Sequence, residues 1–232
     1  MSQFTPKFIY FDLDDTLLNH KKAEQNALSD LKQQYNLFSD VEIEELKSTY
    51  HNINKNLWEQ YGKGEIDRHI LHRKRFEDTM RELRIDSTKY TEAGELYMSF
   101  YRKHWEWIDG AELAFEQIRD RFPVGLITNG FAETQWLKIK QFNFEELVSQ
   151  IVISEEVGVM KPHPKIFNYS TELVGVDRSE ILYVGDSLTS DVIGAKKAGW
   201  KVAWFTSSPT SEDKDLADFV FDDFEELVDF IN

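Results

Sequence analysis

Short apolar runs rich in β-branched and aromatic residues recur along the chain, and segments with helical periodicity separate them. Such runs predict buried strands, and their alternation with helices predicts a parallel sheet covered on both faces. The predicted strands are Phe8–Phe11, Val124–Ile127, Ile151–Ser154, Ile181–Val184, Val202–Phe205 and Phe219–Phe221. The helices expected between the later strands are Ala111–Arg121, Ala132–Phe142, Pro164–Leu173 and Leu188–Ala198, and a last helix follows Phe221. The predicted fold class is therefore α/β.

The stretch between the first two predicted strands has a different pattern. From about Asn19 to Trp107 it shows helical periodicity and no convincing strand. The helices expected there are Lys21–Tyr35, Val41–Tyr61, Ile66–Leu83 and Thr91–Trp105. The predicted domains are an α/β core of residues 1–18 and 108–232 and an all-helical cap domain of residues 19–107. Both ends of the helical stretch return near the first strand, which favours an insertion that closes over that strand's end; a separate helical domain is the alternative.

Composition excludes several classes of function. The 232 residues contain no apolar run long enough to span a bilayer and no signal-peptide pattern, so we expect a soluble, cytoplasmic protein. The absence of cysteine excludes disulfides, zinc–thiolate sites and thiol nucleophiles. A formal charge of −15 argues against a nucleic-acid-binding surface, because such domains are usually basic. It leaves an anionic small substrate open, since a metal and a few basic groups can dominate one pocket.

Three acidic residues follow the first predicted strand directly. Phe8–Phe11 is followed by Asp12, Asp14 and Asp15 at the place where open α/β sheets bind their ligands. Burying these carboxylates together is costly unless a cation or a proton offsets their repulsion. The sequence therefore predicts a metal here. Asp12 and Asp14 are two residues apart on an extended chain, so they can point the same way and divide two chemical roles.

Two further segments carry groups suited to an anion. Thr128 and Asn129 end the second strand and can offer a hydroxyl, an amide and backbone N–H groups, while Gly130 allows close approach. Lys161 precedes Pro162 in a rigid extended segment, which gives its ammonium a fixed direction of approach. Ordinary turn chemistry and a surface lysine are the alternatives for these two segments.

A second acidic pair follows the strand Ile181–Val184. Asp186 and Asp191 lie about one helical turn apart, an arrangement that suits Mg²⁺ because this hard cation takes oxygen ligands. Alternatively, Asp186 caps a helix and Asp191 lies on its solvated face. Four polar clusters, three of them at strand ends of one predicted sheet, favour a shared site.

Together the four clusters resemble the motifs of the haloacid dehalogenase superfamily, in order and at plausible spacing. The helical insertion after the first strand matches the C1 cap position of that superfamily, and the resemblance implies a Rossmann-like core. The residues that carry it are Asp12-Leu13-Asp14-Asp15-Thr16, Thr128-Asn129-Gly130, Lys161-Pro162, and Gly185-Asp186-Ser187 with Asp191.

The resemblance implies a role for each acid. Asp12 matches the nucleophile, which would form an aspartyl-phosphate, and Asp14 matches the general acid–base. Mg²⁺ would be bound by Asp12, by the backbone carbonyl of Asp14 and by Asp186, with Asp191 orienting the metal's ligands or waters. A carboxylate at Asp14 points to phosphoryl transfer, since dehalogenases of this fold characteristically lack an aspartate there.

The resemblance also assigns the groups that contact the phosphate. Thr128 and Lys161 would hold the phosphoryl oxygens and the developing charge. Asp15, Asn129 and Ser187 would help through backbone or indirect contacts.

Substrate selection is expected from the helical stretch. Arg68, His72 and Arg75 share one helix face and suit an anionic ligand, and Phe76, Trp58 or Tyr61 can stack on a base. A solvated basic face paired with neighbouring acids is the alternative. The whole chain is similar to a bacterial branch of the superfamily that contains pyrimidine nucleoside 5′-monophosphatases.

We therefore expect a Mg²⁺-dependent 5′-nucleotidase acting on pyrimidine nucleoside monophosphates. A sugar-phosphate phosphatase, a phosphomutase and a non-catalytic phosphate-binding module remain alternatives. The expected partner is a small phosphomonoester, with no nucleic acid and no membrane, and the chain is expected to be a monomer or a weak homodimer.

Overall fold

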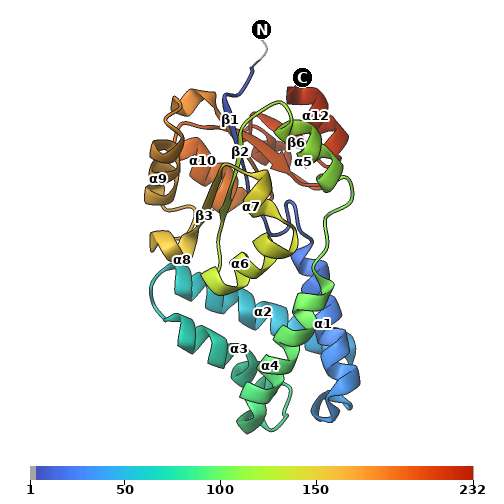
Figure 1. The fold of residues 1–232 in the computed structure, drawn as a ribbon. Helices are drawn as coiled ribbons and strands as arrows, with labels where there is room; N and C mark the ends of the chain where they lie inside the picture. The colour runs from blue at the N-terminus through green and yellow to red at the C-terminus, as the bar shows by residue number, and fades with distance from the viewer. Residues whose placement is uncertain (1–3, 232) are drawn as a thin grey trace. The chain divides into compact units, whose positions relative to one another are not determined.

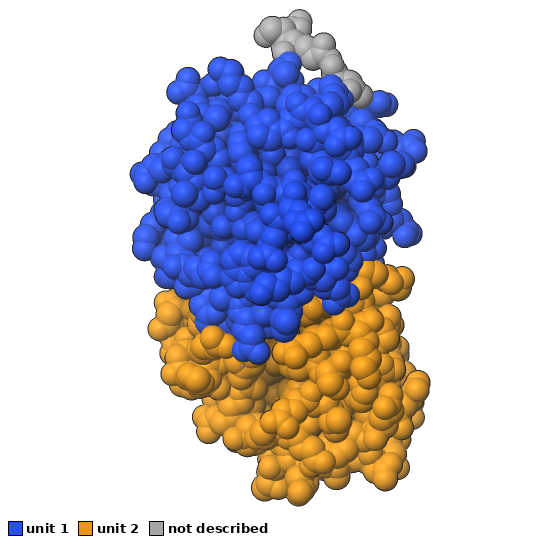
Figure 2. Space-filling model, in the orientation of Figure 1, with its two compact units in different colours: residues 1–19, 107–232 blue, residues 20–106 orange. Residues whose placement is uncertain are grey.

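The chain folds into two compact units, and the structure, a computed structural model, describes residues 4–231 (Figures 1 and 2). Residues 1–19 and 107–232 form one unit, and residues 20–106 form the other. The first unit combines strands and helices, whereas the second contains helices alone. The predicted α/β fold with an all-helical insertion after the first strand is thus confirmed.

The first unit is built on a parallel sheet, which has six strands among residues 4–231. The strands are β1 (Phe8–Phe11), β2 (Val124–Thr128), β3 (Gln150–Ile153), β4 (Ile181–Gly185), β5 (Lys201–Phe205) and β6 (Phe219–Phe221). Their order is β3-β2-β1-β4-β5-β6, so β1 lies between β2 and β4. After β1 the chain first adds β2 and β3 on one side of the sheet and later β4, β5 and β6 on the other side. Open α/β sheets bind ligands beyond the carboxyl ends of their strands, at the place where the strand order reverses in this way.

Both faces of the sheet are buried, which explains why the strands are apolar throughout. Side chains alternate between faces along a strand. Ile9 and Phe11 pack into one hydrophobic core, and Phe8 and Tyr10 pack into another. No face of β1 is left for water, so polar residues appear only where the strand ends.

Helices cover the two cores. Four helices of the described chain contribute side chains to the core that contains Ile9 and Phe11: α5 (Ala111–Arg119), α6 (Ala132–Gln141), α7 (Phe144–Leu147) and α12 (Phe224–Ile231). Those that join the core of Phe8 and Tyr10 are α9 (Pro164–Val174) and α10 (Gly194–Lys197). The short helices α8 (Ser154–Val157) and α11 (Ser211–Lys214) complete this unit within the described residues.

The second unit has four main helices in the described chain: α1 (His20–Gln34), α2 (Ile43–Gly62), α3 (Arg68–Glu82) and α4 (Tyr90–Tyr101). Its core is aromatic: Tyr50, Phe76 and Tyr97 contact one another with ring centroids 5.1–5.3 Å apart. These three side chains are buried, so the predicted stacking of Phe76 on a substrate base is wrong. None of the helices in the described part of the chain is long and apolar enough to cross a membrane.

Several element boundaries differ from the sequence prediction. Helix α3 begins at Arg68 rather than at residue 66, because the Asp67 side chain accepts a hydrogen bond from Ile70 N and caps the helix. The predicted helix over 91–105 ends at Tyr101 and continues as a 3₁₀ turn, Arg102–His104. The predicted helix over 188–198 begins as a π-helical segment, Leu188–Ile193, which leads into α10. Helices α7, α8 and α11 are too short for periodicity to reveal.

Candidate active site

The register of the sheet brings three polar strand ends together. The last residue of β1 pairs with Leu126 of β2 and with Val184 of β4. Asp12 follows β1 directly, Thr128 is the last residue of β2, and Asp186 follows β4. All three therefore lie at the same edge of the sheet, as the sequence predicts.

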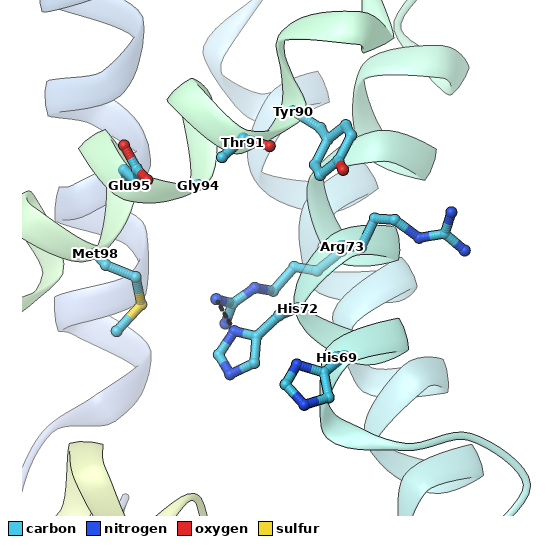
Figure 3. A pocket seen from close by; sticks show the side chains of 9 residues that line it. His69, His72, Arg73, Tyr90, Thr91, Gly94, Glu95 and Met98 are labelled. Atoms are coloured by element: carbon cyan, nitrogen blue, oxygen red, sulfur yellow. Dashed lines mark hydrogen bonds between the residues drawn. The ribbon is translucent and has the colours of Figure 1, made fainter.

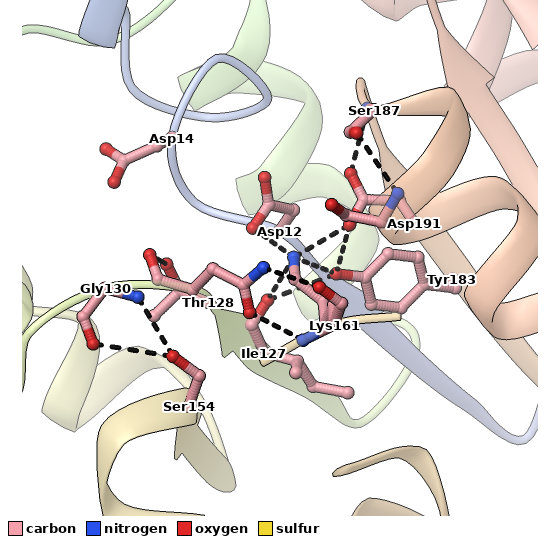
Figure 4. A network of polar contacts seen from close by, with 12 residues as sticks. Asp12, Asp14, Ile127, Thr128, Gly130, Ser154, Lys161, Tyr183, Ser187 and Asp191 are labelled. Atoms are coloured by element: carbon pink, nitrogen blue, oxygen red, sulfur yellow. Dashed lines mark hydrogen bonds and ion pairs between the residues drawn. The ribbon is translucent and has the colours of Figure 1, made fainter. Parts of the chain in front are cut away.

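Lys161 is the cation at the centre of this edge. Its Nζ lies 2.6 Å from Asp12 Oδ1 and 2.8 Å from Asp191 Oδ1. It also donates to the Tyr183 hydroxyl at 2.7 Å and to the Ile127 carbonyl at 3.0 Å (Figure 4). The Lys161 side chain is buried, so these oxygens replace water around the ammonium. Lys161 thereby fixes the orientation of the Asp12 carboxylate.

Burial strongly affects the charges of this pair. Burial raises the pKa of Asp12 well above its usual range; Lys161 opposes that rise, and the carboxylates of Asp191 and Asp186 add to it. Burial alone would lower the pKa of Lys161, but Asp12 and Asp191 outweigh it and raise that pKa. Lys161 is therefore a permanent cation that contacts two of these three carboxylates, those of Asp12 and Asp191.

Asn129 positions the backbone of Lys161. Asn129 Oδ1 accepts a hydrogen bond from Lys161 N at 2.8 Å, and Asn129 Nδ2 donates to Lys161 O at 3.0 Å. From the sequence, Asn129 is expected at the substrate. In the structure both polar atoms of its side chain bind Lys161.

Asp191 is held at the π-helical segment that follows β4. Its Oδ2 accepts a hydrogen bond from Ser187 N at 2.9 Å, and its Oδ1 lies 3.2 Å from the Tyr183 hydroxyl. A Cβ on Gly185 would lie 2.5 Å from Asp191 Oδ2, so the carboxylate occupies the space that a side chain at residue 185 would take. Asp191 is fully buried, which excludes the alternative that it lies on a solvated face.

Asp12, Asp186 and Asp191 fit a hard metal ion. One carboxylate oxygen from each residue lies within 4.8 Å of the other two. Mg²⁺ prefers such oxygen ligands, and a divalent charge would offset the excess of carboxylates over ammonium groups. The side chain of Asp14 is not part of this cluster.

The carboxylate of Asp14 points to helix α6. Lys138 Nζ lies 2.6 Å from Asp14 Oδ1 and 2.8 Å from Oδ2, and Gln135 Nε2 donates to Oδ2 at 3.0 Å. Figure 4 shows Asp14 on the loop that follows Asp12. Asp12 and Asp14 therefore have different environments, as a division of two roles requires.

Thr128 and Asp15 flank this carboxylate. The Thr128 hydroxyl is buried and accepts a hydrogen bond from Gln135 Nε2 at 2.5 Å. Asp15 has a left-handed backbone with φ of 62°, and its N–H donates to Leu18 O at 2.7 Å. That hydrogen bond closes a turn that begins directly after Asp14.

The two arginines predicted at the substrate lie on α3. Arg75 is buried within the helical unit, where its guanidinium lies 5.6 Å from the Tyr97 ring centroid and 3.3 Å from His72 Nδ1. Arg68 is half-buried at the start of the helix. Arg75 is thus part of the interior of the unit rather than of a solvated basic face.

A cavity of about 320 Å³ lies within the helical unit (Figure 3). Two arginines, two histidines and a tyrosine line it together with smaller, apolar and acidic residues: His69, His72, Arg73, Arg75, Tyr90, Thr91, Gly94, Glu95 and Met98. Burial, together with Arg75, Arg68 and His69, lowers the pKa of His72 to about 4. His72 is therefore neutral near pH 7.

Sequence reasoning missed three residues of the site: Tyr183, Gln135 and Lys138. Tyr183 lies inside β4 and reads as an ordinary core residue. A lysine and a glutamine on a helix are normally expected in solvent, yet each of these side chains is only 2% exposed. Their positions, three residues apart on one helix face, were the only available signal.

The chain belongs to the haloacid dehalogenase-like hydrolase family, whose sequence model matches residues 9–205. The pyrimidine 5′-nucleotidase YjjG of Escherichia coli K12 is 31% identical over 211 residues, which cover 90% of this chain and 90% of that protein. A glyceraldehyde 3-phosphate phosphatase of Pyrococcus abyssi is 32% identical over 206 residues, 86% of this chain and 81% of that protein. The family predicted from the motifs is confirmed, and its relatives include phosphatases of different substrates.

A solved structure supports the same fold over nearly the whole chain. The structure of YfnB from Bacillus subtilis, described as a HAD-hydrolase bound to magnesium, has a TM-score of 0.83 at 27% identity. It covers 98% of this chain, and 99% of that chain is matched.

Proposed function

We propose that this protein is a Mg²⁺-dependent phosphomonoester hydrolase in which Asp12 is the nucleophile. The observation that carries the proposal is the contact of Asp12 Oδ1 with Lys161 Nζ at 2.6 Å, in a buried site at the end of β1. A buried carboxylate oriented by a permanent cation is poised to attack an electrophile. Asp186 and Asp191 lie next to it, and together the three carboxylates form a group that can hold a metal ion.

The reaction proceeds in two steps. A carboxylate oxygen of Asp12 forms a bond to phosphorus as the bond to the ester oxygen breaks, and Asp14 gives its proton to that leaving oxygen. Asp14 then takes a proton from water, the water oxygen bonds to phosphorus, and the Asp12 carboxylate is released with inorganic phosphate. Thr128 holds a phosphoryl oxygen, Lys161 supplies positive charge beside it, and Asp15 and Asn129 support these two residues through the backbone.

Mg²⁺ would be held by Asp12, Asp186 and the backbone carbonyl of Asp14, with Asp191 orienting these groups. When bound, it would supply positive charge to the phosphoryl oxygens.

Pyrimidine nucleoside monophosphates are the proposed substrates. The similarity to YjjG supports this choice, since that protein is a pyrimidine 5′-nucleotidase and the match covers 90% of both chains. A sugar-phosphate phosphatase is the second candidate, because the glyceraldehyde 3-phosphate phosphatase of Pyrococcus abyssi is equally similar.

We further propose that residues 20–106 act as the cap domain and select the substrate. Arg68 and Arg75 remain the proposed contacts for the leaving group, and the basic and aromatic lining of the cavity beside Arg75 supports an anionic or aromatic ligand.

Phosphate release from a panel of phosphomonoesters tests the proposal. The panel contains UMP, dUMP, TMP, AMP, glucose 6-phosphate and glyceraldehyde 3-phosphate, each with Mg²⁺ and with excess chelator. Asp12→Asn is the active-site variant, and Asp222→Asn, which changes an exposed carboxylate, is its matched control. We expect metal-dependent release concentrated in the pyrimidine nucleotides, and a loss of roughly 1,000-fold or more in Asp12→Asn alone.

Other outcomes separate the parts of the proposal. Release concentrated in sugar phosphates would keep the roles of Asp12 and Asp14 and discard the nucleotidase. Binding of nucleotide without release, unchanged in Asp12→Asn, would favour a phosphate-binding module.

A further inference from the structure

Two side chains of α6 connect Asp14 to Thr128. Gln135 and Lys138 lie three residues apart, so they share one face of the helix. Lys138 Nζ contacts both oxygens of Asp14, at 2.6 and 2.8 Å. Gln135 Nε2 donates to Asp14 Oδ2 at 3.0 Å and to Thr128 Oγ1 at 2.5 Å. A single amide therefore joins the proposed acid–base to a proposed phosphate ligand.

The hydrogen-bonding capacity of Gln135 fixes the direction of these contacts. An amide nitrogen carries two hydrogens, so Gln135 Nε2 can donate to both acceptors at once. Thr128 Oγ1 then acts as an acceptor toward Gln135, and its own hydrogen is directed elsewhere. Its donation to Asn129 O spans 3.5 Å, the limit of a hydrogen bond, so a phosphoryl oxygen would be a better acceptor.

Gly130 provides the space for this arrangement. A Cβ at residue 130 would lie 2.9 Å from Gln135 Cδ, and the glycine has a φ of 154°. Gly130 thus leaves room for the Gln135 side chain, in addition to allowing the backbone conformation of the turn.

Folding alone does not require these two side chains. Both are 2% exposed, at helix positions where apolar residues pack without a desolvation cost. Replacing a buried ion pair by well-packed apolar residues is often neutral or stabilising. A buried lysine and glutamine that both contact Asp14 are thus better explained by a role in the site.

We propose that Lys138 and Gln135 are positioning residues that hold the Asp14 carboxyl group where it meets the leaving oxygen. This inference rests on the proposed phosphatase function. In the first step Asp14, having taken up a proton from water, gives it to the ester oxygen as the bond from that oxygen to phosphorus breaks, and the carboxylate that remains is the form that Lys138 and Gln135 contact. Lys138 and Gln135 do not react; they restrict Asp14 to one position relative to Thr128 and thus to the phosphoryl group.

Two substrates of similar shape test the inference. Benzyl phosphate has an alkoxide leaving group that needs a proton, whereas 4-nitrophenyl phosphate has a stable leaving group that does not. The readout is the ratio of kcat/KM for benzyl phosphate to kcat/KM for 4-nitrophenyl phosphate. Loss of active protein, of metal or of Thr128 contacts lowers both values and leaves the ratio unchanged.

We expect Lys138→Met to lower this ratio by roughly 10- to 100-fold. The loss is smaller than the full contribution of a general acid, because Asp14 itself is still present. Gln135→Leu should lower the ratio as well. Lys138→Arg keeps the cation and should restore part of the ratio. Lys140→Met changes an exposed lysine of the same helix and should leave the ratio at the wild-type value.

An unchanged ratio in both folded variants, Lys138→Met and Gln135→Leu, would overturn the inference and leave the phosphatase standing. If the wild-type protein hydrolysed neither ester and no member of the substrate panel with Mg²⁺ present, the proposed function itself would fail.

Discussion

Lys161 Nζ lies within hydrogen-bonding distance of four oxygen atoms, two from carboxylates, one from Tyr183 and one from a backbone carbonyl. An ammonium has only three hydrogens, so this coordination leaves it little freedom to move. Asn129 fixes the backbone of the same lysine through two further hydrogen bonds. The position of Asp12 is therefore set by neighbours on several different elements rather than by its own loop.

Gly185→Ala tests this packing at a residue that carries no charge. The added Cβ would lie 2.5 Å from Asp191 Oδ2 and 2.6 Å from its Cγ, so Asp191 must move. We expect a loss of about 1–3 kcal/mol in the free energy of unfolding and a higher Mg²⁺ concentration for half-maximal activity. Urea unfolding and a Mg²⁺ titration of activity measure these two quantities.

Gly94→Ala is the matched control for the urea unfolding, because the nearest atom to its added Cβ is 3.4 Å away and the residue lies within α4. It should be neutral or stabilising, since alanine favours a helix over glycine by about 1 kcal/mol. An unchanged Mg²⁺ requirement in Gly185→Ala would show that Asp191 does not depend on the space at residue 185.

Single elements show how far the sequence predicts the site. Asp12, Thr128 and Asp186 were predictable, because strand ends in a parallel sheet meet at one edge and hydrophobic runs locate the strands. The contact of Lys138 with Asp14 was not, since the two residues are 124 positions apart and periodicity gives no information on which helix face meets which strand end. The π-helical segment was also missed. At its start the Asp191 carboxylate accepts a hydrogen bond from Ser187 N, and hydrophobic periodicity carries no information about that contact.

Helix α3 carries a prediction about pH. His72 has a pKa of about 4 in the folded protein against 6.5 for an ordinary histidine, mainly because it is buried. Between these values the unfolded chain binds a proton that the folded chain does not, so His72 lowers stability as pH falls from about 6.5 to about 4. Above pH 6.5 both states are neutral, and the contribution vanishes.

Urea unfolding at several pH values measures this effect as a difference between proteins. Relative to wild type, His72→Gln should lose less stability between pH 6.5 and pH 4, because it has no imidazole to protonate. Asn52→Gln changes an exposed, non-titrating residue of α2 and should follow the wild-type curve. Parallel curves for wild type and His72→Gln would contradict the lowered pKa.

On the scale of the whole molecule, charge is unevenly distributed. The chain has a formal charge of −15, yet the residues around the site include the buried cations Lys138 and Lys161. Each contacts a carboxylate, so neither leaves an uncompensated positive charge. Asp186 lies in the cluster with Asp12 and Asp191 for which a divalent cation is proposed.

Mg²⁺ should therefore stabilise the entire fold. A ligand at 100 times its Kd adds about 2.7 kcal/mol to the free energy of unfolding. For a chain of this size that corresponds to a rise of about 5–10 °C in Tm. Asp186→Asn should lose most of the rise, whereas Asp222→Asn should retain it. Thermal unfolding at constant ionic strength measures the rise in Tm for the wild type and for each variant. An equal rise in the wild type, Asp186→Asn and Asp222→Asn would indicate nonspecific binding of the cation.

The most direct test of the account is to identify the residue that becomes phosphorylated during turnover. Protein mixed with a hydrolysed substrate is quenched in acid within milliseconds, digested, and analysed by mass spectrometry for the mass of one added phosphoryl group. We predict that this mass appears on the peptide containing Asp12 and is absent in Asp12→Asn. Phosphate on a different residue, or turnover without any covalent phosphate, would contradict the assignment of Asp12 as the nucleophile.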